Sequence, residues 1–198
     1  MVEKKSWSWY NFILIAVIVI CVGLIVFQNI HSITGHVTEA NTVSNVTITN
    51  YYATEMSADL ASGIYFGSQE TLPATANATQ NYAGGSSSTT YFMNVSTNSN
   101  LAVDFCVKSN TDLTDSSSGQ IIALANETYS NATSSNSGTP SFGNRVSFTT
   151  SYVKAGENVA RGNSTYYRFW LYLPPATEAG TYNNTIYFAG TGTGGSCT

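Results

Sequence analysis

TYYRFWLYLPPATEAGTYNNTIYF, residues 165–188, carries the clearest fold signal in this chain. Apolar side chains alternate with other residues in its first and last parts, a period of two that is typical of strands with one buried face. Pro174 and Pro175 interrupt the strand ladder, and Ala179-Gly180 provides a turn. We therefore predict an antiparallel hairpin here. Its inward-facing residues would be Tyr167, Phe169, Leu171, Leu173, Tyr182, Ile186 and Phe188.

Similar strand patterns recur upstream, separated by clusters rich in Ser, Gly, Thr and Asn such as Ala83–Ser88 and Ser130–Pro140. No segment after the N-terminal region shows helical spacing for more than two turns. About eight strands with polar loops predict an all-β chain folded as a single antiparallel β-sandwich, of the jelly-roll or Ig-like type. The predicted strands are Val43–Thr49, Ser57–Phe66, Thr89–Ser96, Leu101–Lys108, Gln120–Leu124, Arg145–Val153, Thr165–Leu173 and Tyr182–Phe188.

An uncharged run, FILIAVIVICVGLIVF at residues 12–27, follows Lys4 and Lys5 near the N-terminus. Apolar runs with basic residues before them are typical of export signals and membrane anchors. Aromatic residues before the run extend the predicted transmembrane or signal helix to residues 7–27. No clear cleavage triplet follows, the nearest being Ser32-Ile33-Thr34, so both retention as a membrane anchor and removal as a signal peptide stay open. In either case we expect the rest of the chain to be extracellular, at the cell surface.

The chain divides by composition into four parts. Residues 1–30 hold the cytoplasmic tip and the transmembrane or signal helix, and residues 31–42 form a linker or donor strand. Residues 43–190 form the extracellular β-sandwich, which is one domain of ordinary size. Residues 191–198 form a Gly-rich tail that contains Cys197.

Seven N-x-S/T sequons support export and predict a glycoprotein with N-linked glycans. Around several of them the apolar residues alternate away from the Asn, which would place a glycan on the solvent-facing side of a strand. Unmodified polar strand residues are the alternative. The sequons begin at Asn45, Asn77, Asn94, Asn126, Asn131, Asn163 and Asn183.

Charged residues make up only 9% of the chain, and the net charge is −4. The basic residues after the apolar run are scattered, so no patch is present that would neutralise nucleic acid phosphates, and we expect no nucleic acid partner. These residues are Lys108, Arg145, Lys154, Arg161 and Arg168.

Two of the three cysteines, Cys106 and Cys197, lie beyond the apolar run, and we predict that they form a disulfide. In the strand-like stretch LAVDFCVK, residues 101–108, the odd-numbered apolar residues define a core face and leave Cys106 on the other face. The bridge would close a loop of about ninety residues and tie down the Gly-rich tail. In the chain-entropy model such a loop is worth about 4 to 5 kcal/mol.

Both histidines, His31 and His36, precede the predicted domain. A serine or cysteine nucleophile would therefore lack an imidazole base, and zinc would lack its usual ligands. Nothing in the sequence pairs the carboxylates across a cleft, so we expect no enzyme activity and no cofactor or metal. Asp112 and Asp115 would act as turn caps, with calcium binding as the alternative.

The chain resembles the TasA/camelysin-like archaeal surface-filament proteins, which include bundling pili and threads. The resemblance rests on GIYFG at residues 63–67, NLAVDFCVKSN at residues 100–110 and LYLPPATEAGTYNNTIYF at residues 171–188. It implies a β-sandwich that polymerises into an extracellular filament by donor-strand complementation, with other copies of itself as partners. A chain that kept its anchor would depart from this pattern.

Three functions follow as hypotheses. In the first, the chain is a structural subunit of a cell-surface filament, and Ile33, Gly35 and Val37 lie on one face of a donor strand. In the second, the domain is a membrane-anchored monomeric or complex-bound module for adhesion or envelope contact, held through residues 7–27, with an exposed contact patch on one strand face. That patch would consist of Arg168, Trp170 and Tyr172. In the third, the chain is a pilin-like subunit with a helical filament core.

Overall fold

The computed structural model of this protein describes residues 9–33, 43, 45–84, 88–134 and 138–198, which fall into two units that meet between Thr47 and Ile48. In the N-terminal unit the apolar run is helical, as predicted, within α1 (Trp9–Ile33). Among the described residues no helix is both long and apolar enough to cross a membrane, in contrast to the transmembrane span expected over residues 7–27.

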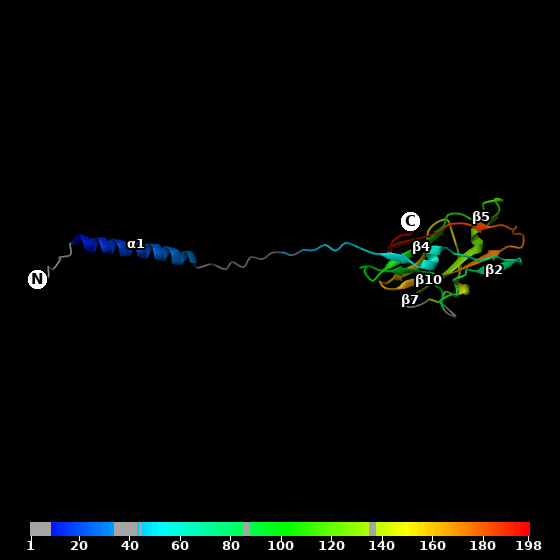
Figure 1. The fold of residues 1–198 in the computed structure, drawn as a ribbon, viewed down its shortest axis with the longest axis horizontal. Coiled ribbons are helices and arrows are strands. Elements are labelled where there is room, and N and C mark those ends of the chain that lie inside the picture. Colours follow the sequence, from blue (N-terminus) through cyan, green and yellow to red (C-terminus); the bar gives the residue numbers. More distant parts are fainter. Residues whose placement is uncertain (1–8, 34–42, 44, 85–87, 135–137) are drawn as a thin grey trace. The chain divides into compact units, whose positions relative to one another are not determined.

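The C-terminal unit is mostly β-sheet, as predicted, and its strands form three antiparallel sheets (Figure 1). Besides the strands, it contains the short α-helix α2 and the two 3-10 turns η1 and η2. The elements in chain order are β1 (Thr54–Met56), α2 (Ala58–Ser62), β2 (Ala74–Asn77), β3 (Phe92–Val95), β4 (Val103–Ser109), β5 (Leu113–Asp115), β6 (Ile121–Ile122), η1 (Leu124–Asn126), β7 (Glu127–Ser134), η2 (Phe142–Asn144), β8 (Val146–Ser147), β9 (Val153–Val159), β10 (Ser164–Leu173), β11 (Tyr182–Asn183) and β12 (Ile186–Gly192).

β10 is the central strand of the largest sheet. It pairs with β3 and β7, while β1 and β8 extend the order to β1-β3-β10-β7-β8, and β2 pairs with the C-terminal half of β10. The second sheet has the order β12-β4-β9, and the third has the order β11-β5-β6. All the described pairings are antiparallel, so each strand can present one face to the interior.

Side chains from the first two sheets meet in one hydrophobic core. Tyr167 and Phe169 of β10 contribute to the core from one sheet, and Phe105 of β4 contributes from the other. The core face predicted for residues 101–108 is confirmed at Val103, Phe105 and Val107, which are fully buried. Burial of large aromatic rings on both sides gives this core most of its apolar area.

The predicted hairpin is wrong, although its inward-facing residues are confirmed as buried or half-buried. β10 lies in the first sheet, whereas β11 pairs with β5 and β12 pairs with β4. The connection through Pro174 and Pro175 therefore joins different sheets. The rings of Tyr167 and Phe188 meet between them, with centroids 5.3 Å apart. A period of two identifies a buried face, but it does not identify the neighbouring strand.

The strand predicted over Ser57–Phe66 is also wrong, because this segment begins with α2. The Ser57 hydroxyl caps the helix by accepting a hydrogen bond from the Leu60 N–H, and Leu60 is buried in the core. Gly63, with a φ of 120°, ends the helix in a conformation that favours glycine. The helix cap at Ser57 therefore has more influence on this segment than the alternation of apolar residues toward Phe66 that predicted a strand.

Two further strand expectations failed. The predicted polar loop Ser130–Pro140 begins inside β7, which pairs with β10 over eight residues from Ser134 to Glu127. Long-range pairing overrides the weak strand propensity of its Ser and Asn residues. In contrast, the described residues of the predicted strand Val43–Thr49 belong to no strand, and their apolar side chains are exposed.

Candidate functional site

A groove of about 1060 Å³ lies in the described part of the C-terminal unit, and both apolar and polar side chains line it. Its walls come from the segment 63–72, from residues 177–186 around β11, and from the ends of β7 and β10. A hollow of this size matches those that bind ligands or peptide segments in proteins. Its apolar lining includes Leu60, Ile64, Phe66, Leu113, Ile122, Leu171, Leu173, Ile186 and Phe188.

One wall of the groove has backbone N–H groups without a protein acceptor, although the carbonyls of Tyr65 and Phe66 accept hydrogen bonds from Thr79 N–H and Gln69 Nε2. Residues 63–70 belong to no helix or strand, and all of them line the groove. In the described part of the chain, no backbone N–H from Ile64 to Leu72 donates a hydrogen bond to another protein group. Backbone donors beside apolar side chains are the arrangement that accepts an added strand.

A buried carboxyl lies in the wall of this groove. Glu127, the first residue of β7, is only 2% exposed, and it pairs with Leu171 in the register of β7 and β10. Its Oε2 accepts a hydrogen bond from Asn184 Nδ2 over 2.7 Å, and the same Nδ2 also donates to Ser109 Oγ over 3.1 Å. These contacts join β7, β4 and the connection between β11 and β12.

Burial raises the pKa of Glu127 to about 7, although the hydrogen bond from Asn184 lowers it. Near neutral pH the carboxyl is therefore close to half protonated. The protonated form can donate a hydrogen bond, and the charged form only accepts. The groove thus contains one polar group whose hydrogen-bonding character changes with pH.

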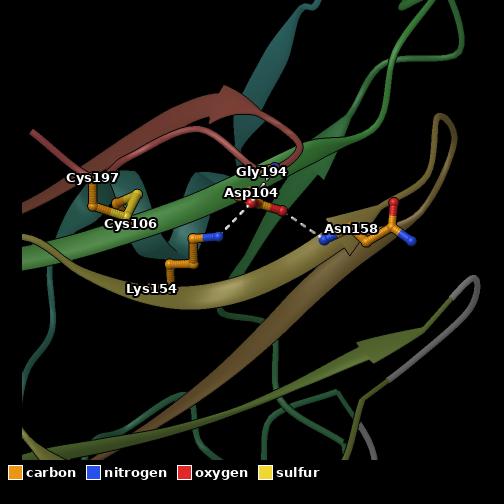
Figure 2. Close-up of a disulfide and its surroundings, with 6 residues drawn as sticks. All are labelled: Asp104, Cys106, Lys154, Asn158, Gly194 and Cys197. Atoms are coloured by element: carbon orange, nitrogen blue, oxygen red, sulfur yellow. Dashed lines mark hydrogen bonds and ion pairs between the residues drawn. A yellow bond between two sulfur atoms is a disulfide. The ribbon is translucent and has the colours of Figure 1, made fainter.

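The predicted disulfide is confirmed. It joins Cys106 of β4 to Cys197, with Cα atoms 5.8 Å apart and a sequence separation of 91 residues. Figure 2 shows that Asp104, two residues before Cys106 on β4, lies beside the same C-terminal tail. Cys106 is almost fully buried and lies outside the main core cluster, consistent with its predicted place on the opposite face of β4.

Asp104 holds three segments together (Figure 2). Its carboxylate accepts hydrogen bonds from the backbone N–H groups of Asn158 and Gly194 over 2.8 and 3.0 Å, and it forms a 2.8 Å ion pair with Lys154. Burial raises the pKa of Asp104, but the hydrogen bonds from Asn158, Lys154 and Gly194 outweigh burial and leave the pKa below its ordinary value. The carboxylate stays charged and fastens the tail near the disulfide.

The predicted turn-capping role agrees with the hydrogen bonds of Asp115, whereas the carboxylate of Asp112 accepts from a residue twelve positions further along the chain. Asp115 accepts hydrogen bonds from the hydroxyls and backbone N–H groups of Ser117 and Ser118, and Asp112 accepts one from the Leu124 N–H. The Ser118 and Ser117 hydroxyls lower the pKa of Asp115 to about 2. Both carboxylates therefore have structural partners within the fold.

The predicted contact patch on β10 is wrong, because two of its three residues are covered. Trp170 is 2% exposed and packs edge-on against the Phe142 ring, with centroids 5.2 Å apart. Arg168 is buried, with Nε donating to the Asn81 carbonyl and Nη1 donating to the Pro140 carbonyl. Only Tyr172 remains substantially exposed. Long-range loops cover this face, and strand alternation alone does not reveal them.

The predicted donor-strand residues are not placed in a strand. Ile33 is the last residue of the α1 helix, and Gly35 and Val37 lie outside the described residues. Among the sequons, Asn45, Asn77, Asn131 and Asn183 are exposed, whereas Asn94, Asn126 and Asn163 are half-buried. Glycosylation at all seven stays a prediction.

Sequence reasoning missed the residues that shape the groove. Glu127 follows Asn126 within a sequon, and its burial results from the pairing of β7 with β10, which was not predicted. Asn81 was missed as well. Its buried side chain accepts a hydrogen bond from the Phe169 N–H and donates one to the Phe169 carbonyl, which continues the pairing of β10 beyond the end of β2.

Comparison with known proteins gives no family for this chain. No protein-family model matches it, and no curated protein or solved structure is significantly similar to it.

Proposed function

We propose that this chain is a non-enzymatic structural subunit of an extracellular filament, assembled by donor-strand complementation between copies of itself. The domain in this proposal is an antiparallel β-sandwich of the jelly-roll or Ig-like type. Support for two facing layers comes from the shared core, to which both β10 and β4 contribute. The groove would mark the place where one strand of that sandwich is supplied by another subunit.

The observation that carries the proposal is a run of backbone N–H groups, from Ile64 to Leu72, that donate to no other protein group in the described part of the chain and lie along the groove. An inserted strand would hydrogen-bond to this backbone and bury alternate side chains among Leu171, Leu173 and Ile186. Main-chain hydrogen bonds would supply affinity, and the spacing of the apolar wall would fix the register.

The donor in this proposal is the segment 43–48. Val46 and Ile48 are 80% and 76% exposed, stand two residues apart, and belong to no helix or strand. Thr49, which follows this segment, is tied to the domain, because its carbonyl accepts a hydrogen bond from Asn100 Nδ2. Because side chains two residues apart share one face of a strand, Val46 and Ile48 would enter the groove together. The donor in this proposal therefore differs from the predicted one at Ile33, Gly35 and Val37, of which Ile33 is the last residue of α1.

An oxidising location fits this role. The Cys106–Cys197 disulfide is of a kind that persists outside the reducing cytoplasm. A domain without histidine, with hydroxyl and amide groups in place of most charges, suits a structural role at the cell surface. N-linked glycans at exposed sequons would add to its solubility.

Charge substitution in the donor tests the proposal. Val46→Asp combined with Ile48→Asp should abolish filaments in electron micrographs and leave monomers in size-exclusion chromatography, since two buried charges cannot be accommodated among the apolar side chains of the groove. Thr47→Asp is the matched control, because Thr47 faces away and its charge would stay in solvent. Filaments that survive the double substitution would refute the donor assignment.

A cross-linking experiment tests the acceptor. In a Cys21→Ser background, Ile48→Cys with Leu173→Cys should give a ladder of disulfide-linked oligomers on non-reducing gels, whereas Thr47→Cys with Leu173→Cys should not. Monomers from the wild-type chain under all conditions would instead favour the alternative of a surface domain that acts alone or in a complex.

A further inference from the structure

A second hollow, of about 450 Å³, lies on the first sheet and shares no lining residue with the groove. Residues of β2, η1, β7, β8 and β10 line it, together with Arg145. We name it the Tyr172 hollow. Its lining consists of Thr75, Ala125, Asn126, Thr128, Arg145, Ser147, Trp170 and Tyr172.

The lining combines an accessible aromatic ring with polar groups. The Tyr172 ring is 42% exposed, and Thr75, Asn126 and Ser147 add a carboxamide and hydroxyls. Arg145 is the one charged residue among the eight. No carboxylate lines the hollow, so its charge favours neutral or acidic ligands over cations.

Arg145 is held in place at the rim. Its guanidinium lies over the Phe142 ring, 3.8 Å from the centroid, and its Nη1 donates to the Phe142 carbonyl over 3.0 Å. A guanidinium has five N–H donors in a fixed fork, so this contact leaves donors for a ligand. The positioning costs a ligand little entropy, because the side chain is already ordered.

Asn126 adds a further donor to the lining. Within the described residues, no hydrogen bond to another protein group is present for its carboxamide. The Thr128 and Ser147 hydroxyls, in contrast, donate to the carbonyls of Trp170 and Ala125. Polar groups that line a hollow without a partner favour a ligand rich in hydroxyls.

We propose that the Tyr172 hollow binds a saccharide. A sugar ring has an apolar C–H face that packs on an aromatic ring and hydroxyls at its edge that pair with amide, hydroxyl and guanidinium groups. Tyr172 provides the packing surface, and Asn126 and Arg145 provide the donors. Because Arg145 brings a positive charge, a sugar acid such as a uronic acid binds more tightly than the corresponding neutral sugar.

The saccharide has two sources, which experiments distinguish. Asn126 heads a sequon and lines the hollow, so a covalent glycan attached to it would place its first sugar beside Tyr172. The other source is a free or cell-envelope saccharide that binds the unmodified chain. Both use the same chemistry.

The first experiment uses unglycosylated full-length chain from a bacterial host. Calorimetric titration with a glucuronic acid disaccharide, maltotriose and glucosamine should show saturable binding in that order of strength. Tyr172→Ala and Arg145→Met should each weaken binding at least tenfold. Tyr187→Ala and Arg161→Met are controls that change an exposed ring and an exposed cation elsewhere, and circular dichroism would verify that every variant is folded.

The second experiment uses chain from a host with N-glycosylation. Mass spectrometry of the peptide around Asn126 should show a glycan, and Tyr172→Ala should then lower the melting temperature more in the glycosylated chain than in an Asn126→Gln chain. Asn131→Gln serves as the control sequon. A positive result in either experiment supports the saccharide site and names its source. Absence of saccharide binding in the first, together with no glycan-dependent effect of Tyr172 in the second, would overturn the proposal.

Discussion

Asn184 Nδ2 lies 2.7 Å from Glu127 Oε2, so the connection between β11 and β12 is hydrogen-bonded to a buried carboxyl at the start of β7. This contact lies in the wall of the groove that we propose as the acceptor site. The ionisation of Glu127 therefore bears on both the stability of the domain and the character of the groove.

Stability should fall as pH rises between about 4.5 and 7. The pKa of Glu127 rises from 4.5 to about 7 on folding because burial disfavours the charged carboxylate. Its contribution to stability is thus fully present below pH 4.5 and is lost as pH rises through 7. Glu127→Gln should flatten this dependence and raise the free energy of unfolding at pH 8 by about 3 kcal/mol, the equivalent of such a shift.

Urea unfolding at several pH values measures this effect. Glu178→Gln is a suitable control, because Glu178 is a second carboxyl that lines the groove. An unchanged pH profile in the Glu127→Gln chain would contradict the assignment.

Removal of the disulfide should destabilise the C-terminal unit strongly. Cys106→Ser with Cys197→Ser opens a loop spanning 91 residues and should lower the free energy of unfolding by about 4 kcal/mol. Cys21→Ser is the control, since Cys21 is free and lies in α1. Denaturant unfolding without reductant provides the comparison, and a loss below about 1 kcal/mol would show that the tail is held by other contacts.

Asp104 should contribute more to stability than its ion-pair partner. Asp104→Asn removes the charge that accepts the Asn158 and Gly194 N–H groups, with an expected loss of about 2 kcal/mol. Lys154→Met should cost less than Asp104→Asn, because the lysine side chain is 35% exposed and solvent partly screens its ion pair.

The pH dependence checks the Asp104 assignment independently. The folded-state pKa of Asp104 lies below 3.8, so its contribution is present above pH 3.8 and is lost as pH falls through the lowered value. Thermal unfolding between pH 2 and 5 should show a smaller loss in Asp104→Asn than in the wild type, the remaining loss coming from other carboxyls with a lowered pKa such as Asp115. Equal losses for Asp104→Asn and Lys154→Met would mean that the ion pair, rather than the backbone hydrogen bonds, is the source of the stability.

Local pattern predicted much of the chain correctly. The strand-rich class, the helix in the apolar run, the core face of β4 and the disulfide all follow from period, composition and cysteine placement. In β10, Tyr167 and Phe169 were expected inside, and both are fully buried. These features depend on residues close together in sequence or on a single pair of cysteines.

The features that failed depend on long-range partners. β7 is rich in Thr, Ser and Asn, yet it pairs with the central strand β10, so its polar sequence concealed a core strand. Trp170 and Arg168 face outward on β10 as expected, but Phe142 and the carbonyls of Asn81 and Pro140 cover them. The groove was not predicted for the same reason. One of its walls contains residues 63–66, which the sequence predicted to be part of a strand.

The link between Cys106 and Cys197 also determines how the domain carries a mechanical load. A pull between the segment before Ile48 and the residue after Cys197 runs along the chain to Cys106 and then across the sulfur atoms to Cys197. Residues 107–196 lie outside that force path and cannot be drawn out while the covalent link is intact. Under tension the domain is therefore much less extensible than its chain length implies.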